Sequence, residues 1–160
     1  MPANPVPRGL RTVTASLTVK GAKQAIEFYK NAFGAELLMK MESPDGGIGH
    51  AELKIGDSVI FLNDEFPQGT SKSPVTLGGT TGGIQLYVND VDSSFKRAID
   101  AGAKPAMPPM DMFWGDRMSQ IIDPFGHAWG ISTHKEDLTQ AEMENRANEF
   151  WQKMAAGQKA

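Results

Sequence analysis

One arrangement of elements occurs twice in this chain, in the same order, and this repeat limits the folds that the chain can adopt. In each copy, a short strand-like segment precedes an amphipathic helical stretch, and two further strand-like segments follow around a glycine-containing turn. The first copy comprises residues 17–19, 22–33, 50–55 and 58–63, and the second comprises residues 86–88, 91–101, 117–122 and 127–133. Such internal similarity predicts a duplicated supersecondary unit. We therefore expect an α+β domain built from two similar modules.

The spacing of apolar residues separates the strands from the helices. Over residues 13–19 apolar and polar side chains alternate, which predicts a half-buried strand. Over residues 22–33 apolar side chains recur at helical spacing. Residues 104–114 contain three prolines and three methionines, and this composition predicts a loop. A capping-box pattern at residues 139–142 predicts a terminal helix, with an apolar stripe at Met143, Ala147, Phe150 and Met154.

These elements divide the chain into five segments. They are an N-terminal arm (1–10), the first module (11–66), a linker rich in Gly, Ser, Thr and Pro (67–82), the second module (83–135), and a C-terminal helix and tail (136–160). A chain of 160 residues can bury one sizeable core but is too short for two large independent ones. Two half-size modules that share one sheet fit this length.

Charge and composition exclude several classes of function. The chain carries 16 Lys and Arg against 19 Asp and Glu, without a run of like charge, which argues against nucleic-acid binding. No apolar segment approaches the roughly 20 residues of a membrane span, and residues 1–10 lack the apolar core of a signal peptide. The protein is therefore expected in the cytoplasm, without a membrane partner. Because cysteine is absent, any metal site would have to use His, carboxylate or amide oxygen.

Several short motifs occur in an order that is typical of one superfamily. They are Leu-Thr-Val at 17–19, Ile-Glu-Phe-Tyr at 26–29, Phe-Gly-Ala at 33–35, His-Ala-Glu-Leu at 50–53, Asp-Pro-Phe-Gly-His at 123–127 and Thr-His at 133–134. Over about residues 10–138 the chain resembles the vicinal-oxygen-chelate superfamily, which includes glyoxalase I, bleomycin-resistance proteins and extradiol dioxygenases, and within it the PhnB-like branch. The resemblance implies two βαβββ modules that form one cupped mixed sheet with helices on its convex side, and a homodimer.

The resemblance also implies where a metal ion would bind. Metal-dependent members of the superfamily place one ligand, usually His or Glu, in the first and in the last strand of each module. The matching positions here are Thr14, Phe61, Gly83 and Gly130, none of which is a usual metal ligand. We therefore expect no metal cofactor at these positions, and leave open a divalent ion at an atypical site. Glyoxalase or dioxygenase activity does not follow from the fold alone.

The same four positions indicate which side chains face the hollow of the cup, because residues two apart on a strand share a face. In residues 50–55 the side opposite Leu53 and Ile55 carries His50 and Glu52, and the corresponding face of residues 117–122 carries Arg117 and Ser119. The mixture of directional polar groups favours a small-molecule pocket, with an ordinary solvated sheet face as the alternative. Arg117 is the candidate for gripping a carboxylate or phosphonate, unless it forms a salt bridge to Glu52 or Asp116. The predicted ligand-binding residues, which include the aromatic pair beside residues 104–112, are Ser16, Asn63, Gln85, Tyr87, Phe113, Trp114 and Arg117.

Functions from three classes fit this pattern. The first is a metal-independent, PhnB-like protein that binds a small polar or anionic ligand. The second is a lyase, isomerase or dioxygenase in which His50 and Glu52, two apart on one face, act as an acid/base pair or hold an atypical metal ion. The third is a structural or regulatory dimer whose hollow is filled by side chains or by the partner's arm. His127 and His134 are predicted to be turn and surface residues.

Overall fold

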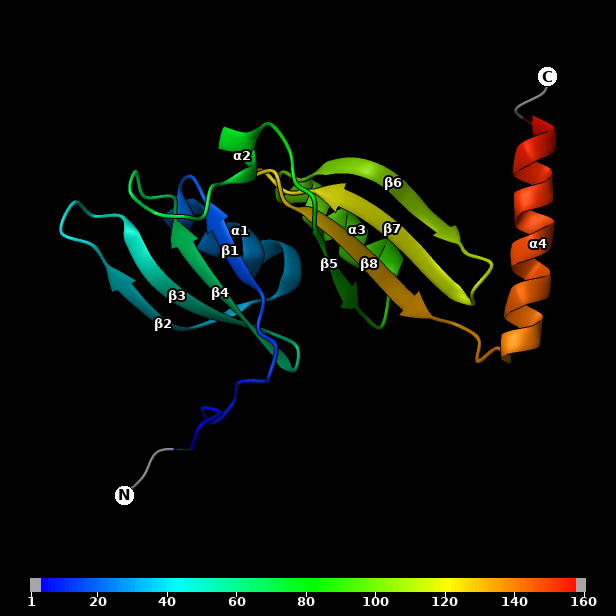
Figure 1. Ribbon diagram of the computed structural model, residues 1–160, viewed down its shortest axis with the longest axis horizontal. Coiled ribbons are helices and arrows are strands. Elements are labelled where there is room, and N and C mark those ends of the chain that lie inside the picture. The colour runs from blue at the N-terminus through cyan, green and yellow to red at the C-terminus, as the bar shows by residue number, and fades with distance from the viewer. Residues whose placement is uncertain (1–3, 158–160) are drawn as a thin grey trace.

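The computed structural model describes residues 4–157 and places the two modules side by side along the longest axis of the molecule (Figure 1). The first module consists of β1 (Ser16–Val19), α1 (Ala22–Phe33), β2 (Glu36–Glu42), β3 (Ile48–Ile55) and β4 (Ser58–Asp64). The second consists of β5 (Gly83–Tyr87), α3 (Val91–Asp100), β6 (Lys104–Asp111), β7 (Asp116–Ile122) and β8 (Ala128–His134). A short helix, α2 (Pro74–Leu77), interrupts the linker, and α4 (Gln140–Gly157) follows the second module. The predicted α+β class and both βαβββ modules are confirmed.

The strands form two four-stranded sheets with the same topology. Their orders are β1-β4-β3-β2 and β5-β8-β7-β6. In each sheet the first strand of the module pairs in parallel with the last, and the other neighbours pair antiparallel. The resemblance implied one cupped sheet, but residues 4–157 form two sheets, because no strand of one module pairs with a strand of the other.

β6 corrects the prediction of a loop over residues 104–114. The segment pairs antiparallel with β7, with register shifts between Pro105 and Met107 and between Met107 and Met110. β6 lies at the edge of its sheet, and a proline on an edge strand need not donate a ladder hydrogen bond if its nitrogen points outward. The prolines of this segment are therefore compatible with strand pairing.

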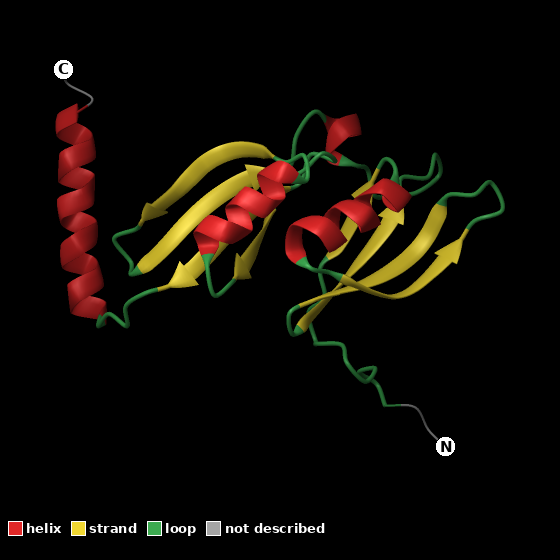
Figure 2. Cartoon of the chain, turned by 180° about the vertical axis from the view of Figure 1, so that it is seen from behind, coloured by secondary structure: helices red, strands yellow, loops and turns green. Residues whose placement is uncertain are grey.

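α1 and α3 cover the same side of the two sheets and pack against each other (Figure 2). The buried side of α1 includes Ala22, Ile26 and Tyr29, as its helical spacing predicts. In the second module Trp129 is 1% exposed, and its ring lies 4.7 Å from that of Phe33 on α1. Trp129 is therefore a core residue at the junction of the modules. Within residues 4–157, the opposite faces of both sheets carry no helix (Figure 2).

One buried carboxylate joins the modules. Asp123, which is 2% exposed, begins the Asp-Pro-Phe-Gly turn between β7 and β8. Its Oδ2 accepts hydrogen bonds from Tyr29 Oη at 2.7 Å and from Trp129 Nε1 at 2.9 Å, while its Oδ1 accepts two from backbone nitrogens of the turn. Burial, and then the charge of Asp123, raises the pKa of Tyr29. Next to this turn, His127 Nε2 lies 3.1 Å from the carbonyl oxygen of Thr18 in the first module.

The linker is held against the same turn. Ser73 caps the N-terminus of α2, and its backbone nitrogen and hydroxyl both donate to Glu65 Oε2, at 2.9 and 2.6 Å. Together with the hydroxyl of Thr76, these donors lower the pKa of Glu65 to about 2. Pro74 packs on Gly126, where any Cβ would lie only 2.8 Å from the Cβ of the proline. The turn at 123–126 therefore touches both modules and the linker.

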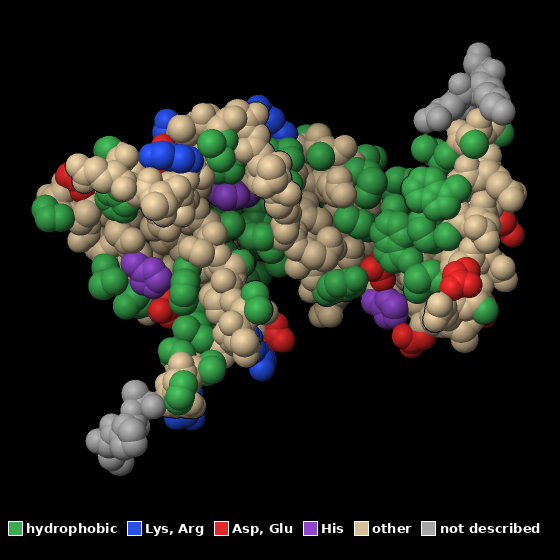
Figure 3. All heavy atoms as spheres, viewed as in Figure 1, with side chains coloured by type: hydrophobic (Ala, Val, Ile, Leu, Met, Phe, Trp, Pro, Cys, Tyr) green, Lys and Arg blue, Asp and Glu red, His purple; other side chains and the backbone are tan. Residues whose placement is uncertain are grey.

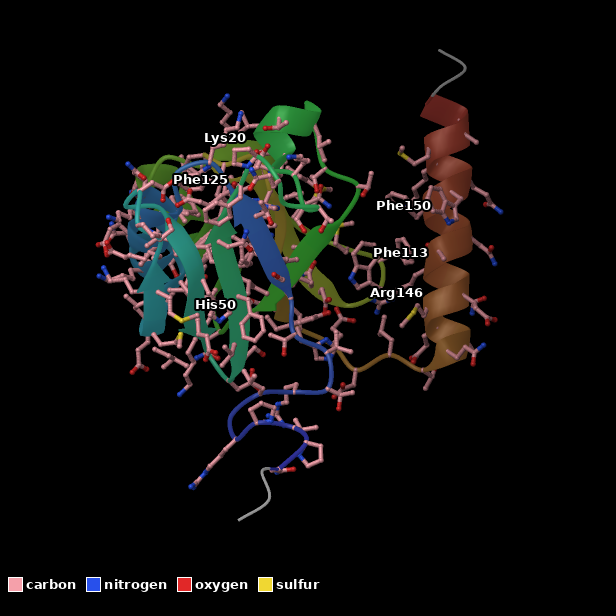
Figure 4. The ribbon with its side chains drawn as sticks, turned by 60° about the vertical axis from the view of Figure 1, so that its left-hand side comes forward. Lys20, His50, Phe113, Phe125, Arg146 and Phe150 are labelled. Carbon is pink, nitrogen blue, oxygen red and sulfur yellow. The ribbon has the colours of Figure 1, made fainter. Side chains whose placement is uncertain are left out.

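α4 stands apart from both sheets, and none of its residues is buried (Figure 1). Phe150, on its predicted apolar stripe, points toward Phe113 at a ring distance of 5.3 Å (Figure 4). Apolar atoms gather along the side of α4 that faces the second module (Figure 3), while Met143, Trp151 and Met154 stay exposed. Within residues 4–157, no helix is long and apolar enough to cross a membrane.

Candidate functional site

The second sheet has an open face on the side away from α3. On β7, Ser119 and Ile121 are fully buried on the helix side, so their neighbours in the strand point the other way. On β5, the alternation of half-buried Ile84 and Leu86 with exposed residues follows the same rule. The open face therefore carries Gln85, Tyr87, Asp116, Met118, Gln120 and Ser132.

Arg117 and Ser119 do not lie on this face, and the prediction that placed them there was wrong. Arg117 alternates with Asp116 and points toward α3, where its Nε and Nη2 bind the two carboxylate oxygens of Asp92 at 2.8 and 2.9 Å. Its Nη1 donates to Asp111 at 3.1 Å. Hydrogen bonds to Asp92, and then to Asp111, raise the pKa of Arg117 above its usual range. Arg117 thus forms salt bridges on the helix side, with partners other than Glu52 or Asp116.

Asp116 is the centre of the hydrogen-bond network on the open face. Its side chain is 5% exposed, and Oδ2 accepts from Tyr87 Oη at 2.9 Å and from Trp114 Nε1 at 3.2 Å. Its Oδ1 lies 2.8 Å from His134 Nδ1, while His134 Nε2 lies 3.0 Å from Asp137 Oδ1. Hydrogen bonding to Asp116, and then to Asp137, raises the pKa of His134. The network fixes Tyr87 and Trp114 around one buried carboxylate.

A cavity of about 300 Å³ lies beside this network. Gln85 Nε2 donates to Ser132 Oγ at 2.7 Å, which holds the Gln85 amide against the sheet. A neighbouring hollow of about 260 Å³ shares Gln85, Met118 and Gln120 with it. The residues that line the cavity are Gln85, Tyr87, Met107, Met112, Trp114, Asp116, Met118, Gln120 and Ser132.

A larger hollow of about 810 Å³ lies between the modules, but its chemistry is less specific. Much of its lining is apolar, and its carboxylates make local turn and cap hydrogen bonds. Asp57 binds the hydroxyl of Ser58, and Asp90 binds backbone nitrogens at the start of α3. The smaller cavity is therefore the candidate site, because its polar groups converge from three strands and a loop.

The structure brings together only some of the predicted site residues. Gln85, Tyr87 and Trp114 line the cavity, whereas Phe113 turns toward Phe150 of α4 (Figure 4). Sequence reasoning missed Asp116, Met118 and Gln120 because it assigned the wrong face of β7. His134 is exposed, as predicted, and it also contacts Asp116, with which the register pairs it directly.

The remaining predicted residues lie on the open face of the first sheet and do not line this cavity. His50 Nε2 lies 3.5 Å from Glu52 Oε1, and the His50 ring lies 4.9 Å from that of Phe61 (Figure 4). Asn63 Nδ2 donates to Thr18 Oγ1 at 3.3 Å, so Asn63 also faces this side. Ser16 is exposed and is in register with Phe61.

The four positions that the superfamily uses for metal do not suit an ion here. Thr14 donates its hydroxyl to the carbonyl oxygen of Arg11 at 3.3 Å. Gly130 has no side chain, and any Cβ at this position would collide with Gln85 Oε1. Within residues 4–157, no three His, Cys, Asp or Glu side chains are grouped so that they could hold a metal ion. These residues therefore do not fit the metal of the superfamily.

Comparison with known proteins agrees with this architecture. The family model described as the Glyoxalase/Bleomycin resistance protein/Dioxygenase superfamily matches residues 11–131. The Mycobacterium tuberculosis protein Rv0887c is 41% identical over 131 residues, which cover 80% of this chain and 77% of that protein. TioX from Micromonospora sp. ML1 superposes with a TM-score of 0.61 at 26% identity, over 81% of this chain and 100% of TioX. The PhnB protein from Bacillus cereus superposes with a TM-score of 0.62 at 14% identity, over 77% and 99% of the two chains.

Proposed function

Because the chain belongs to the Glyoxalase/Bleomycin resistance protein/Dioxygenase superfamily but has no ligands at the usual metal positions, we propose that it binds a small polar molecule without a metal ion. The binding site is the cavity on the open face of the second sheet. The predicted anionic ligand is not part of this proposal, because Arg117 lies on the other side of the sheet and is bound by Asp92 and Asp111.

The observation that carries the proposal is the network around Asp116. A nearly buried carboxylate is costly unless its oxygens accept hydrogen bonds, and here three side chains from different segments satisfy it. The same bonds restrict the rotamers of Tyr87 and Trp114, which are the two aromatic walls of the cavity. Residues held in place before binding lose little conformational entropy when a ligand arrives, which favours recognition.

Titration calorimetry with a panel of small acids, amines, amides and antibiotics tests this function. A compound that binds should release or absorb heat when titrated into the wild-type protein. Its affinity for Trp114→Ala should be at least tenfold lower, because this variant lacks an aromatic wall of the cavity. His50→Ala is the matched control, since His50 lies on the first sheet and outside the cavity. Silence across the whole panel, or equal loss in both variants, would contradict the proposed site.

The pair His50 and Glu52 supports a second candidate, which is proton-transfer chemistry on the first sheet. The 3.5 Å separation allows the carboxylate to orient the imidazole, and both side chains are about one quarter exposed. A lyase, isomerase or dioxygenase of this kind would lose its activity in both His50→Gln and Glu52→Gln. Elemental analysis, followed by assays with added nickel, zinc, manganese or iron, separates its metal-dependent form from its metal-free form.

We further propose that the protein acts in the cytoplasm as a homodimer in which α4 contributes to the interface. The exposed apolar side chains of α4, including Trp151 at 60% and Met154 at 48% exposure, support this proposal because they lack cover within the described chain. Sedimentation of the wild-type protein should show a dimer, and Trp151→Ser should shift it toward the monomer. If the wild-type protein and Trp151→Ser both sediment as monomers, the proposed dimer is refuted. The alternative function as a structural or regulatory dimer is then refuted as well.

A further inference from the structure

The cavity on the second sheet carries only negative charge among its described lining residues. Among the described residues that line it, Asp116 is the only charged side chain, and no Lys or Arg contributes. Arg117 is adjacent in sequence but lies on the opposite face between two carboxylates, Asp92 and Asp111. Behind the cavity, His134 stands between Asp116 and Asp137, so a protonated imidazole still leaves this group of three with a net negative charge. The site therefore attracts positive charge.

The hydrogen bonds of Tyr87 and Gln85 turn acceptor atoms toward the cavity. Tyr87 donates its only hydroxyl proton to Asp116, so its oxygen presents lone pairs to a ligand. Gln85 uses Nε2 to reach Ser132, and its Oε1 lies over Gly130 on the open face. Gln120 is exposed and can act as a donor or as an acceptor. Two of these three groups therefore match a ligand that donates hydrogen bonds.

The rest of the lining suits a flat apolar body. Trp114 and Tyr87 present aromatic groups to the cavity, and a cation close to such a ring is attracted by its quadrupole. Three methionines complete the wall, Met107, Met112 and Met118, and their thioethers adapt to the shape of a ring and contact it favourably. Such a lining binds an aromatic or aliphatic group next to the charged one.

We propose that this cavity binds a cationic amine that carries an aromatic or apolar group, and that it discriminates against carboxylates and phosphonates. The assignment rests on the proposed binding function and narrows its ligand class. The ammonium group lies at Tyr87 Oη and Gln85 Oε1, within the field of Asp116, and the apolar group packs against Trp114 and the methionines.

Three probes of nearly equal size test the ligand class: 2-phenylethylammonium, 2-phenylethanol and phenylacetate. Each is titrated to about 10 mM, where a Kd near 1 mM still gives nearly full occupancy. Proton–nitrogen correlation spectra report the indole N–H of Trp114 and the backbone amides of β5 and β7. We expect the ammonium probe to shift these signals and to bind at least tenfold tighter than phenylacetate, with 2-phenylethanol in between.

Two variants test the origin of this preference. Gln120→Lys adds a positive charge at an exposed position of the lining and should abolish the preference for the ammonium probe, without breaking any described side-chain hydrogen bond. Asp116→Asn removes the negative charge and should also lower the affinity for the ammonium probe at least fivefold. Since Asp116→Asn disturbs a buried network, Gln120→Lys gives the result if the Asn variant does not fold. Arg117→Gln is the control, because it removes a charge from the opposite face and should leave the order of the three probes unchanged.

The outcomes distinguish a failure of the amine assignment from a failure of the proposed binding function. Equal binding of the three probes, or tighter binding of phenylacetate, would overturn the ligand class and leave the cavity as a binding site. Shifts confined to the first sheet would overturn it as well. Silence toward all three probes also refutes the amine assignment, whereas the proposed binding function falls only if the broader calorimetric panel is silent too.

Discussion

Replacement of Tyr29 by Phe measures how strongly the two modules depend on each other. The substitution removes one hydroxyl group, which donates at 2.7 Å to Asp123, and leaves the buried ring in place. A hydrogen bond to a charged acceptor contributes about 1.5–3 kcal/mol, and this acceptor is buried where water cannot replace the lost donor. We therefore expect the free energy of unfolding to fall by about 1.5–3 kcal/mol.

The assay is chemical denaturation followed by circular dichroism, with thermal unfolding as the second measure. For a protein of this size, about 2–4 °C of melting temperature is lost per kcal/mol, so Tyr29→Phe should melt about 3–12 °C lower. The dependence on denaturant concentration should stay unchanged if the change acts on stability alone. A single transition is expected in both proteins because the modules share a core.

Tyr87→Phe is the matched control, because it deletes the same atom from another tyrosine that donates to an aspartate. Although Asp116 itself is only 5% exposed, Tyr87 is 65% exposed and both residues line the cavity, so water can take the place of the lost hydroxyl and the loss should stay below about 1 kcal/mol. If Tyr29→Phe proves no more destabilising than Tyr87→Phe, the buried bond to Asp123 does not couple the modules and the reasoning is refuted.

Three further results are expected. The pKa of Glu65, lowered to about 2, means that its stabilising contribution is complete above pH 4.5 and is lost as the pH falls toward 2; Glu65→Gln should flatten the acid limb of a stability curve over that window. The pKa of Tyr29 is raised in the folded protein, so the unfolded chain loses this proton first and stability should decline as the pH rises above about 10. This decline should be smaller in Tyr29→Phe. In urea denaturation, Gly126→Ala should lower the free energy of unfolding by about 1–3 kcal/mol more than Gly46→Ala does. Both glycines have positive φ, but only at Gly126 would the new Cβ collide with Pro74. Equal losses would show that the linker moves to make room for the methyl group.

The repeat and the motifs predicted the α+β class and both βαβββ modules, but not strand β6 or the division into two sheets. The strand β7 shows why the site was only partly predictable. Gln85 and Tyr87 were placed on the correct face because they share the parity of Gly83, and the observed burial of Ile84 and Leu86 on the other side agrees. On β7, the comparison with His50 and Glu52 of the first module put Ser119 on the open side, whereas Ser119 is fully buried on the helix side.

A signal for the correct face of β7 was nevertheless present. Trp129 shares the parity of the apolar Ile131 and so belongs to the helix side, and partners in an antiparallel pair share a face. The register pairs Trp129 with Ile121, which puts Ile121, and therefore Arg117, on the helix side as well. The network around Asp116 could not be foreseen in the same way, because it depends on the side-chain directions of Trp114 and His134 at strand ends.

The turn at 123–126 makes the two halves of this duplicated chain unequal. It supplies the carboxylate that receives Tyr29, the glycine on which the linker rests, and the approach of the next residue to β1. The corresponding turn of the first module, Gly56-Asp57, is exposed on both residues and makes no such contacts. A chain assembled from two copies of the first half would therefore lack the three contacts by which this turn holds the modules and the linker together.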